Sequence, residues 1–166
     1  MIGSMDTCFL IDWSRYSRRG LLEEAFDFVY VTEDVLREVA SEETLTYVSG
    51  LLARGFLVIY PLRAEAASVA RRAVEISARD PRVPVLDPPE ALALAMARLE
   101  GCVCLTENKG VLRLVQYYEE FSGVEVWRSL ELLEHLYRAG LIEDLEAELE
   151  RYSRETGHVF PKRGGR

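Results

Sequence analysis

Short apolar runs alternate with helical stretches along most of the chain. Buried strands of a parallel sheet are apolar on both faces, so runs of this length predict such strands. The predicted strands are Cys8–Ile11, Phe28–Val31, Phe56–Tyr60, Cys102–Leu105 and a weaker fifth, Val124–Trp127. Strands that alternate with helices predict an α/β domain with three layers, α/β/α, around a mostly parallel central sheet.

Helical periodicity fills the gaps between these runs. Apolar residues at helical spacing between Val35 and Leu52 predict one helix, and three further helices follow before the last strand. Those three are Ala66–Ala78, Ala91–Leu99 and Val111–Tyr118. We expect one domain over residues 1–166, with a core at about 6–128 and a helical extension at about 129–155. The extension comprises Leu130–Tyr137, a turn at Gly140, Leu141–Tyr152 and then the basic tail Lys162–Arg166.

The composition fits a cytoplasmic globular protein. The chain has 166 residues, of which 49% are hydrophobic, and no apolar run approaches the roughly 20 residues that span a bilayer. Its start lacks the basic and then apolar pattern of a secretory signal. Cys8, Cys102 and Cys104 lie in apolar stretches without a CxxC pair, which predicts buried thiols in a reducing compartment.

The charge balance limits how this chain can bind a polyanion. Net charge is −8, from 20 basic and 28 acidic residues, so charge alone does not favour nucleic acid. Bound cations would offset the acids if the chain acts on such a partner. The two histidines, His135 and His158, lie far apart, which gives a His-rich zinc site little support.

Several acids follow predicted strands or open the next helix. Ligand sites in open α/β sheets form beyond the carboxyl ends of the strands, and right-handed crossovers bring those ends to one edge. The residues predicted near that edge are Asp12, Glu38, Glu90, Glu107 and Asn108. No glycine-rich phosphate loop competes for it. The sequence therefore predicts a pocket of carboxylates with one amide.

Each of these residues also has an ordinary structural interpretation. Asp12 and Asn108 can cap helices, and Glu107 can be a surface residue. Glu38 can belong to a solvated acidic helix face, where like charges four residues apart cost about 0.2–0.5 kcal/mol per pair. Asp87-Pro88-Pro89-Glu90 closely resembles a capping box. Their shared position at one edge is what favours a functional interpretation.

Five segments, taken in order, resemble the motifs of PIN-domain nucleases. Asp12-Trp13-Ser14 after an apolar strand resembles the opening motif, and Thr32–Val39 resembles the helix that bears the family's glutamate. The remaining three segments are Leu86–Ala97, an acid opening an Ala-Leu-rich helix; Cys104–Asn108, a strand ending in Thr-x-Asn; and Gly123–Val126, followed by Ser129. Each motif is short, and the specificity lies in the set.

The resemblance implies a Mg²⁺- or Mn²⁺-dependent endoribonuclease. The metal-binding and catalytic residues would be Asp12, Glu38, Glu90 and Asn108. Two positions depart from the family, because Glu90 stands where aspartate is more usual and Asn108 is neutral where many members carry aspartate; Glu107 could complete the site instead. An oxygen-rich site without His or Cys suits a hard cation such as Mg²⁺.

Basic residues near the predicted pocket are candidates for holding RNA. The substrate-binding candidates are Ser14 and Arg15, just past Asp12, and Lys109 and Arg113, just past Asn108; a solvated basic face is the alternative. Trp13 can stack on a base or pack in the core. Many PIN proteins that resemble the toxin VapC pair with a small antitoxin and form homodimers, and the two C-terminal helices offer apolar faces for such contacts. The scarcity of amides, with one Asn and one Gln, is typical of a thermophile or archaeal source, or of a GC-rich genome.

Two other functions compete with a nuclease. One is a catalytically inactive PIN-like module that binds RNA or a protein, which the neutral Asn108 and the acidic net charge favour. The other is a phosphoryl-transfer receiver or phosphatase on a similar sheet. A receiver or phosphatase needs a second acid close to Asp12, as an acid pair or a DxD motif, and this requirement is not met because Trp13 and Ser14 follow Asp12.

Overall fold

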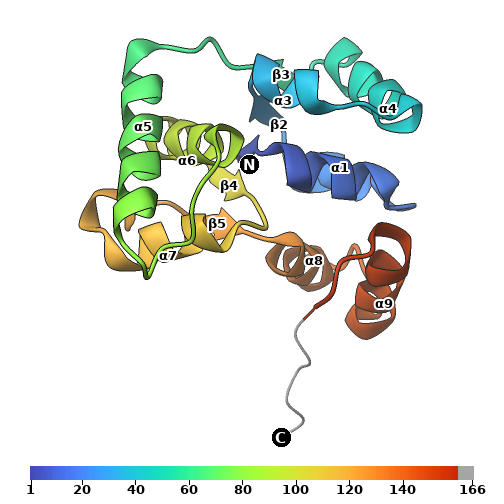
Figure 1. Ribbon diagram of the computed structural model, residues 1–166. Coiled ribbons are helices and arrows are strands. Elements are labelled where there is room, and N and C mark those ends of the chain that lie inside the picture. The colour runs from blue at the N-terminus through green and yellow to red at the C-terminus, as the bar shows by residue number, and fades with distance from the viewer. Residues whose placement is uncertain (161–166) are drawn as a thin grey trace, which may run out of the picture.

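A computed structural model describes residues 1–160 of the chain (Figure 1). The predicted basic tail, Lys162–Arg166, lies outside the described residues. Five strands form one all-parallel sheet in the order β3-β2-β1-β4-β5, which makes the domain a Rossmann-like α/β fold. The strands are β1 (Ile2–Met5), β2 (Phe28–Val31), β3 (Leu57–Ile59), β4 (Val103–Leu105) and β5 (Val126–Trp127).

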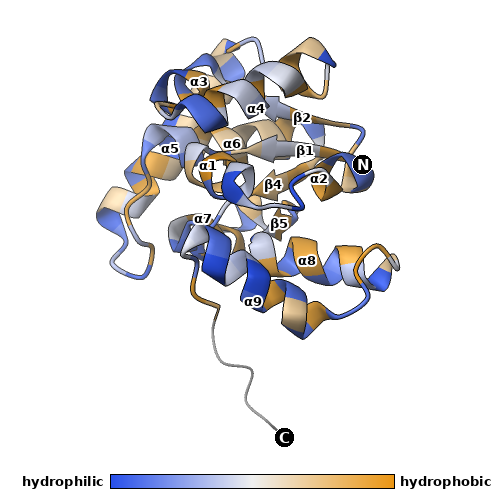
Figure 2. Ribbon diagram, turned by 90° about the vertical axis from the view of Figure 1, so that its right-hand side faces the viewer, coloured by the Kyte–Doolittle hydropathy of each residue, from blue (hydrophilic) through white to orange (hydrophobic). Residues whose placement is uncertain are grey.

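Helices cover both faces of the sheet, as the sequence predicted (Figure 2). Side chains alternate along each strand, so Val29 and Val31 enter one core cluster and Tyr30 packs against the other. The first cluster includes residues of α1, α2, α3, α4, α8 and α9, and the second includes residues of α5, α6, α7 and η1. The helices are α1 (Thr7–Arg15), α2 (Leu21–Ala25), α3 (Glu33–Glu38), α4 (Glu42–Ala53), α5 (Ala64–Arg79), α6 (Pro88–Glu100), α7 (Lys109–Tyr117), η1 (Glu119–Phe121), α8 (Ser129–Arg138) and α9 (Leu145–Thr156).

The predicted strand Cys8–Ile11 is wrong, because these residues lie within helix α1. The first strand is the shorter Ile2–Met5, whose Gly3 and Ser4 do not form an apolar run. Small side chains are needed there: a Cβ on Gly3 would lie 3.3 Å from the Phe26 ring. The Ser4 hydroxyl donates a hydrogen bond of 2.7 Å to the carbonyl of Ala93 in α6. A central strand made of small residues escaped a search for apolar runs.

The other strand predictions hold to within two residues at each end, but one predicted helix is divided. Residues 35–52 form parts of α3 and α4. Helix α3 ends at Glu38, and Ser41 caps α4 by accepting a hydrogen bond from the Thr44 amide at 3.1 Å. The break matters because it leaves Glu38 at the end of a short helix.

The C-terminal extension packs against the start of the chain. Helix α9 begins at Leu145 rather than Leu141, because Asp144 caps it by accepting from the Ala147 amide at 3.1 Å. Trp13 is fully buried and lies 5.6 Å from the Tyr152 ring, so it is a core residue. Within residues 1–160, no helix is long and apolar enough to cross a membrane.

Candidate acidic site

Asp6 is the acid that follows the central strand. Met5 pairs with Leu105 in the β1–β4 ladder, so Asp6 and Thr106 leave the sheet side by side. Asp6 is 1% exposed and caps α1, its Oδ1 accepting from the Phe9 amide at 2.8 Å. Its Oδ2 accepts a short hydrogen bond from the Thr106 hydroxyl. The fold thus fixes a buried carboxylate at the carboxyl edge of the sheet.

The surroundings of Asp6 disfavour its charge. Burial raises the pKa of the Asp6 carboxyl to about 7. The hydrogen bonds from Thr106 and Phe9 oppose this rise, whereas the carboxylates of Glu90 and Glu107 add to it. Asp6 therefore sits where positive charge would stabilise its ionised form.

A cleft of about 500 Å³ opens beside Thr7, the residue that follows Asp6, and the buried Asp6 does not itself line it. It lies between the start of α1, helix α3 and the start of α6, and its lining includes Thr7, Cys8, Glu38 and Glu90. Two buried oxygens there, Thr7 Oγ1 and Glu90 Oε2, have no hydrogen-bond partner within residues 1–160. Unpartnered buried oxygens are uncommon in folded proteins, and they leave acceptors available to a bound group.

Glu90 opens helix α6, as predicted. Asp87 is the N-cap residue and Pro88 the first helical residue, although the Asp87 side chain makes no capping bond within the described part of the chain. Glu90 is 9% exposed, and burial raises its pKa. The backbone of Glu90 and the Asn108 side chain oppose that rise.

Several acids raise the pKa of the Cys8 thiol. Cys8 is exposed, which corrects the prediction of three buried thiols; Cys102 and Cys104 are buried as expected. Burial of part of its side chain, followed by the carboxylates of Asp6, Glu90, Asp12 and Glu38, raises the pKa of Cys8 to about 11. Four acids from three segments of the chain therefore act electrostatically on one atom.

The acids beside the cleft lack neutralising partners. Over residues 1–160, none of Asp6, Glu38 and Glu90 forms an ion pair, and the nearby Arg37 pairs with Glu33 and Asp34 instead. Over the same residues, no group of three or more His, Cys, Asp or Glu side chains stands close enough to hold a metal ion. As the side chains stand, the site offers one or two carboxylates to an ion rather than a closed cage.

Asn108 lies at the same edge and caps the next helix. Its side-chain Oδ1 accepts from the Gly110 backbone amide at 2.7 Å, and the backbone amide of Asn108 donates to Thr106 Oγ1 at 3.0 Å. Thr106 thereby links Asn108 to Asp6. The helix-cap interpretation of Asn108 is correct, and its position beside the acids is also as predicted.

Asp12 is not where the sequence placed it. It lies in the second half of α1 rather than at a strand end. Its nearest cation is Arg15 at 3.8 Å, and the charges that act on its pKa besides burial are those of Arg15, His158 and Glu107. Asp12 thus faces the C-terminal segment more than the cleft.

Glu107 is also directed to that side. Its Oε1 accepts from the Ser129 amide at 2.7 Å, and its Oε2 lies 3.6 Å from His158 Nε2. Both oxygens have partners outside the cleft, so Glu107 does not replace Asn108 there.

The predicted RNA-contacting residues differ in accessibility. Ser14 is 1% exposed, and its hydroxyl is hydrogen-bonded to the Ile11 carbonyl and to Thr44, so no Ser14 atom is available to a substrate. Arg15, Lys109 and Arg113 are exposed.

Sequence reasoning missed Asp6 although a signal was present. Asp6 precedes Phe9, Leu10 and Trp13, which recur at helical rather than strand spacing. An aspartate immediately before such a pattern is a typical N-cap. Read this way, the pattern starts a helix at Thr7 and leaves the preceding residues for the strand.

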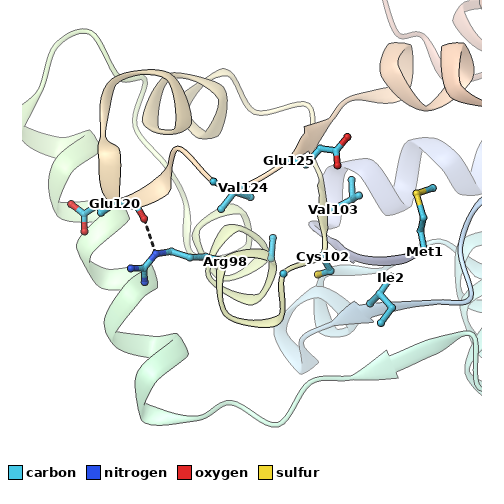
Figure 3. A pocket seen from close by; sticks show the side chains of 11 residues that line it. Met1, Ile2, Arg98, Cys102, Val103, Glu120, Val124 and Glu125 are labelled. Carbon is cyan, nitrogen blue, oxygen red and sulfur yellow. Dashed lines mark hydrogen bonds between the residues drawn. The ribbon is translucent and has the colours of Figure 1, made fainter.

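A second cavity, of about 540 Å³, lies at the opposite, amino end of the strands (Figure 3). Its lining includes Met1, Arg98, Cys102 and Glu125. Arg98 donates a hydrogen bond of 2.7 Å to the Glu120 carbonyl. Glu125 accepts one of 2.9 Å from the Trp127 ring nitrogen.

Comparison of the chain with models of known protein families and with curated proteins finds no match.

Proposed function

We propose that the chain is a divalent-metal-dependent endoribonuclease whose site comprises the acidic cleft lined by Glu38 and Glu90 together with the adjoining Asp6 and Asn108. The observation that carries the proposal is the cleft lined by Glu38 and Glu90, in which Glu90 Oε2 is buried without a hydrogen-bond partner within residues 1–160 and neither acid has an arginine partner there. Crowded carboxylates raise one another's pKa, and an ion between them removes that cost.

The donor set fits a hard cation. Mg²⁺ and Mn²⁺ take oxygen ligands, and Mg²⁺ commonly uses one or two carboxylates and keeps several waters. Asp6 and Glu90 would hold the ion, with Glu38 and the Asn108 amide placed to orient its waters. Such an ion supplies a more acidic bound water and neutralises charge that develops on a phosphate. Thr106 holds the Asp6 carboxylate in place through its hydroxyl.

The resemblance to PIN-domain nucleases supports this proposal. In the sequence that resemblance assigned the strand-end acid to Asp12, but the residue after β1 is Asp6. The positions of Glu38, Glu90 and Asn108 need no change. We therefore propose a PIN-like site in which Asp6 takes the first place.

A second candidate is a PIN-like module that binds RNA or a protein without catalysis. One observation favours it: both Asp6 oxygens already have partners in the fold, so Asp6 also serves as a structural cap. The two candidates differ in whether the cleft binds a divalent ion.

Metal binding and RNA cleavage test the proposal together. We expect calorimetry to detect specific Mn²⁺ binding, and a single-stranded RNA to be cleaved only when Mn²⁺ or Mg²⁺ is present. Glu90→Gln removes one carboxylate without changing the size of the side chain. We expect it to weaken Mn²⁺ binding by about tenfold or more and to reduce cleavage accordingly.

Glu125→Gln is the matched control. It makes the same chemical change at the amino end of the sheet, where Gln can still accept from Trp127. It should bind Mn²⁺ and cleave RNA as the natural chain does. If the natural chain shows no specific Mn²⁺ binding, the non-catalytic module is the better proposal.

A further inference from the structure

Helix α7 carries a row of exposed side chains that leads away from the acidic cleft. Lys109, Arg113 and Tyr117 are spaced by four residues, so they share one face of the helix, and all three are exposed. We call these three residues the α7 row. The helix has two basic residues and no acidic one, in a chain with 28 acids and 20 bases. The row begins next to Asn108, which caps the helix at the carboxyl edge of the sheet.

The cations of the α7 row are not neutralised. In the described range 1–160, neither Lys109 nor Arg113 forms an ion pair, although ten other arginines do so. Arg113 Nη1 donates to the Gln116 side-chain oxygen at 2.8 Å and to the Tyr117 hydroxyl at 3.4 Å, and neither acceptor carries negative charge. The positive charge of the row therefore stays available to an anion.

Tyr117 adds an aromatic surface to this charge. Its ring is 40% exposed, and two guanidinium groups approach it: the Cζ of Arg82 lies 4.8 Å from the ring centre and that of Arg113 lies 5.8 Å away. Arg82 is held in turn by Asp80, which accepts from its Nη2 at 2.7 Å. Aromatic rings and guanidinium planes are the surfaces on which unpaired bases stack.

Close packing fixes the α7 row relative to the loop that carries Arg82. A Cβ on Gly110 would lie 2.4 Å from the Pro84 carbonyl oxygen, so the first turn of α7 sits directly against that loop. Only glycine permits this approach. Arg82 and the α7 row thus belong to one continuous surface, and α7 extends it over about 12 Å from Lys109 to Tyr117.

We infer that the α7 row binds single-stranded RNA, with phosphates at Lys109 and Arg113 and a base against Tyr117; this rests on the proposed nuclease function. The combination selects the partner. Unpaired cations would suit any polyanion, but an exposed aromatic side chain beside two guanidinium groups offers stacking to an unpaired base. A duplex keeps its bases stacked, and an acidic peptide has none. The row therefore favours a single strand and directs it toward the acids.

Fluorescence anisotropy in EDTA measures this binding apart from cleavage. The probe is a labelled single-stranded RNA of about 12 nucleotides. For Lys109→Ala/Arg113→Ala we expect the affinity for the RNA to fall about tenfold or more. The slope of log affinity against log salt concentration should decrease in magnitude by about two, one for each lost phosphate contact. For Tyr117→Ala we expect at least about a fivefold loss for the single strand and little change for duplex RNA.

Arg138→Ala/Arg154→Ala is the matched control, because it removes two exposed positive charges from the C-terminal helices. It should bind the probe as the natural chain does. Unchanged affinity in the α7 variants, or an equal loss in the control, overturns the inference. So does tighter binding of a poly-glutamate peptide than of RNA, which would indicate an acidic protein partner.

The same variants separate this inference from the proposed function. If the α7 variants cleave RNA at the natural rate and bind it with the natural affinity, the inference about the α7 row is wrong but the proposed nuclease function stands. If RNA binding depends on the α7 row but no metal-dependent cleavage occurs, the proposed nuclease function is wrong and the inference about the α7 row stands.

Discussion

The two ends of the sheet carry cavities of nearly the same size and very different chemistry. The cavity at the amino ends measures about 540 Å³ and the cleft at the carboxyl ends about 500 Å³. At the amino end, Arg98 and Glu125 have hydrogen-bond partners, and the Met1 amino group pairs with Asp27 at 2.7 Å. At the carboxyl end, Glu90 Oε2 and Thr7 Oγ1 lack partners within residues 1–160.

This contrast shows that volume is a weak guide to function in this molecule. What separates the ends is that two buried oxygens lack partners at the carboxyl end within residues 1–160, whereas the charged groups named at the amino end are exposed and have partners. A buried carboxylate without a cation is costly, so its presence indicates either a bound partner or a raised pKa. The predictions below test the carboxyl end, from the largest expected effect to the smallest.

Asp6→Asn should have the largest effect on activity. Asn caps helices about as well as Asp, so the hydrogen bond from Phe9 is kept while the charge is lost. We expect metal-dependent RNA cleavage to fall by about 100-fold or more at saturating Mn²⁺. Asp12→Asn makes the same change six residues along, and should leave cleavage within about threefold. The reverse result would restore Asp12 as the strand-end ligand and remove Asp6.

The pH dependence of stability should be smaller but measurable. The pKa of Asp6 is about 7 in the folded chain and 3.8 as its ordinary value, so the folded state binds the extra proton between these limits. Without metal, the free energy of unfolding should therefore fall as pH rises from 5 to 8. We expect a loss of about 2 kcal/mol, measured by urea denaturation in EDTA.

Asp6→Asn should remove most of this slope and make the metal-free chain more stable at pH 8. Burial also raises the pKa of Glu90 and of Asp12, so part of the slope should remain. A stability that rises from pH 5 to 8 would show that Asp6 is not held in the neutral form.

The smallest effect concerns the reactivity of Cys8. Because its pKa is raised to about 11, little thiolate is present at pH 8, and we expect disulfide reagents to label it about tenfold more slowly than an ordinary exposed thiol. Glu90→Gln should quicken labelling by about twofold, since it removes one of the charges that raise this pKa. Glu125→Gln should not change the labelling rate. Cys8→Ser shows which kinetic phase of the labelling reaction belongs to Cys8. Faster labelling in both Glu variants would show a general loosening instead.

Part of the site was predictable from local signals. Glu90 lies in the first turn of a predicted helix and Asn108 caps another, because capping residues and apolar runs act over a few neighbours. Glu38 lies in a stretch predicted to be helical, but the end of α3 at Glu38 was not predicted. Asp6 was missed because β1 has small residues at its centre. Gly3 packs closely against Phe26 and Ser4 donates a hydrogen bond to Ala93, and these partners are 23 and 89 residues away.

The amino-acid sequence by itself determined the α/β class, four of the five strands and the excess of acids, since alternation of apolar runs with helical periodicity is a local property. Only the tertiary structure decided which acid ends the central strand, that Glu107 turns toward Ser129 and His158, and that Glu90 Oε2 is buried without a partner within residues 1–160. Those outcomes depend on strand register and on packing between distant segments. The identity of a residue gives its charge, but only the folded chain determines whether that charge has a partner.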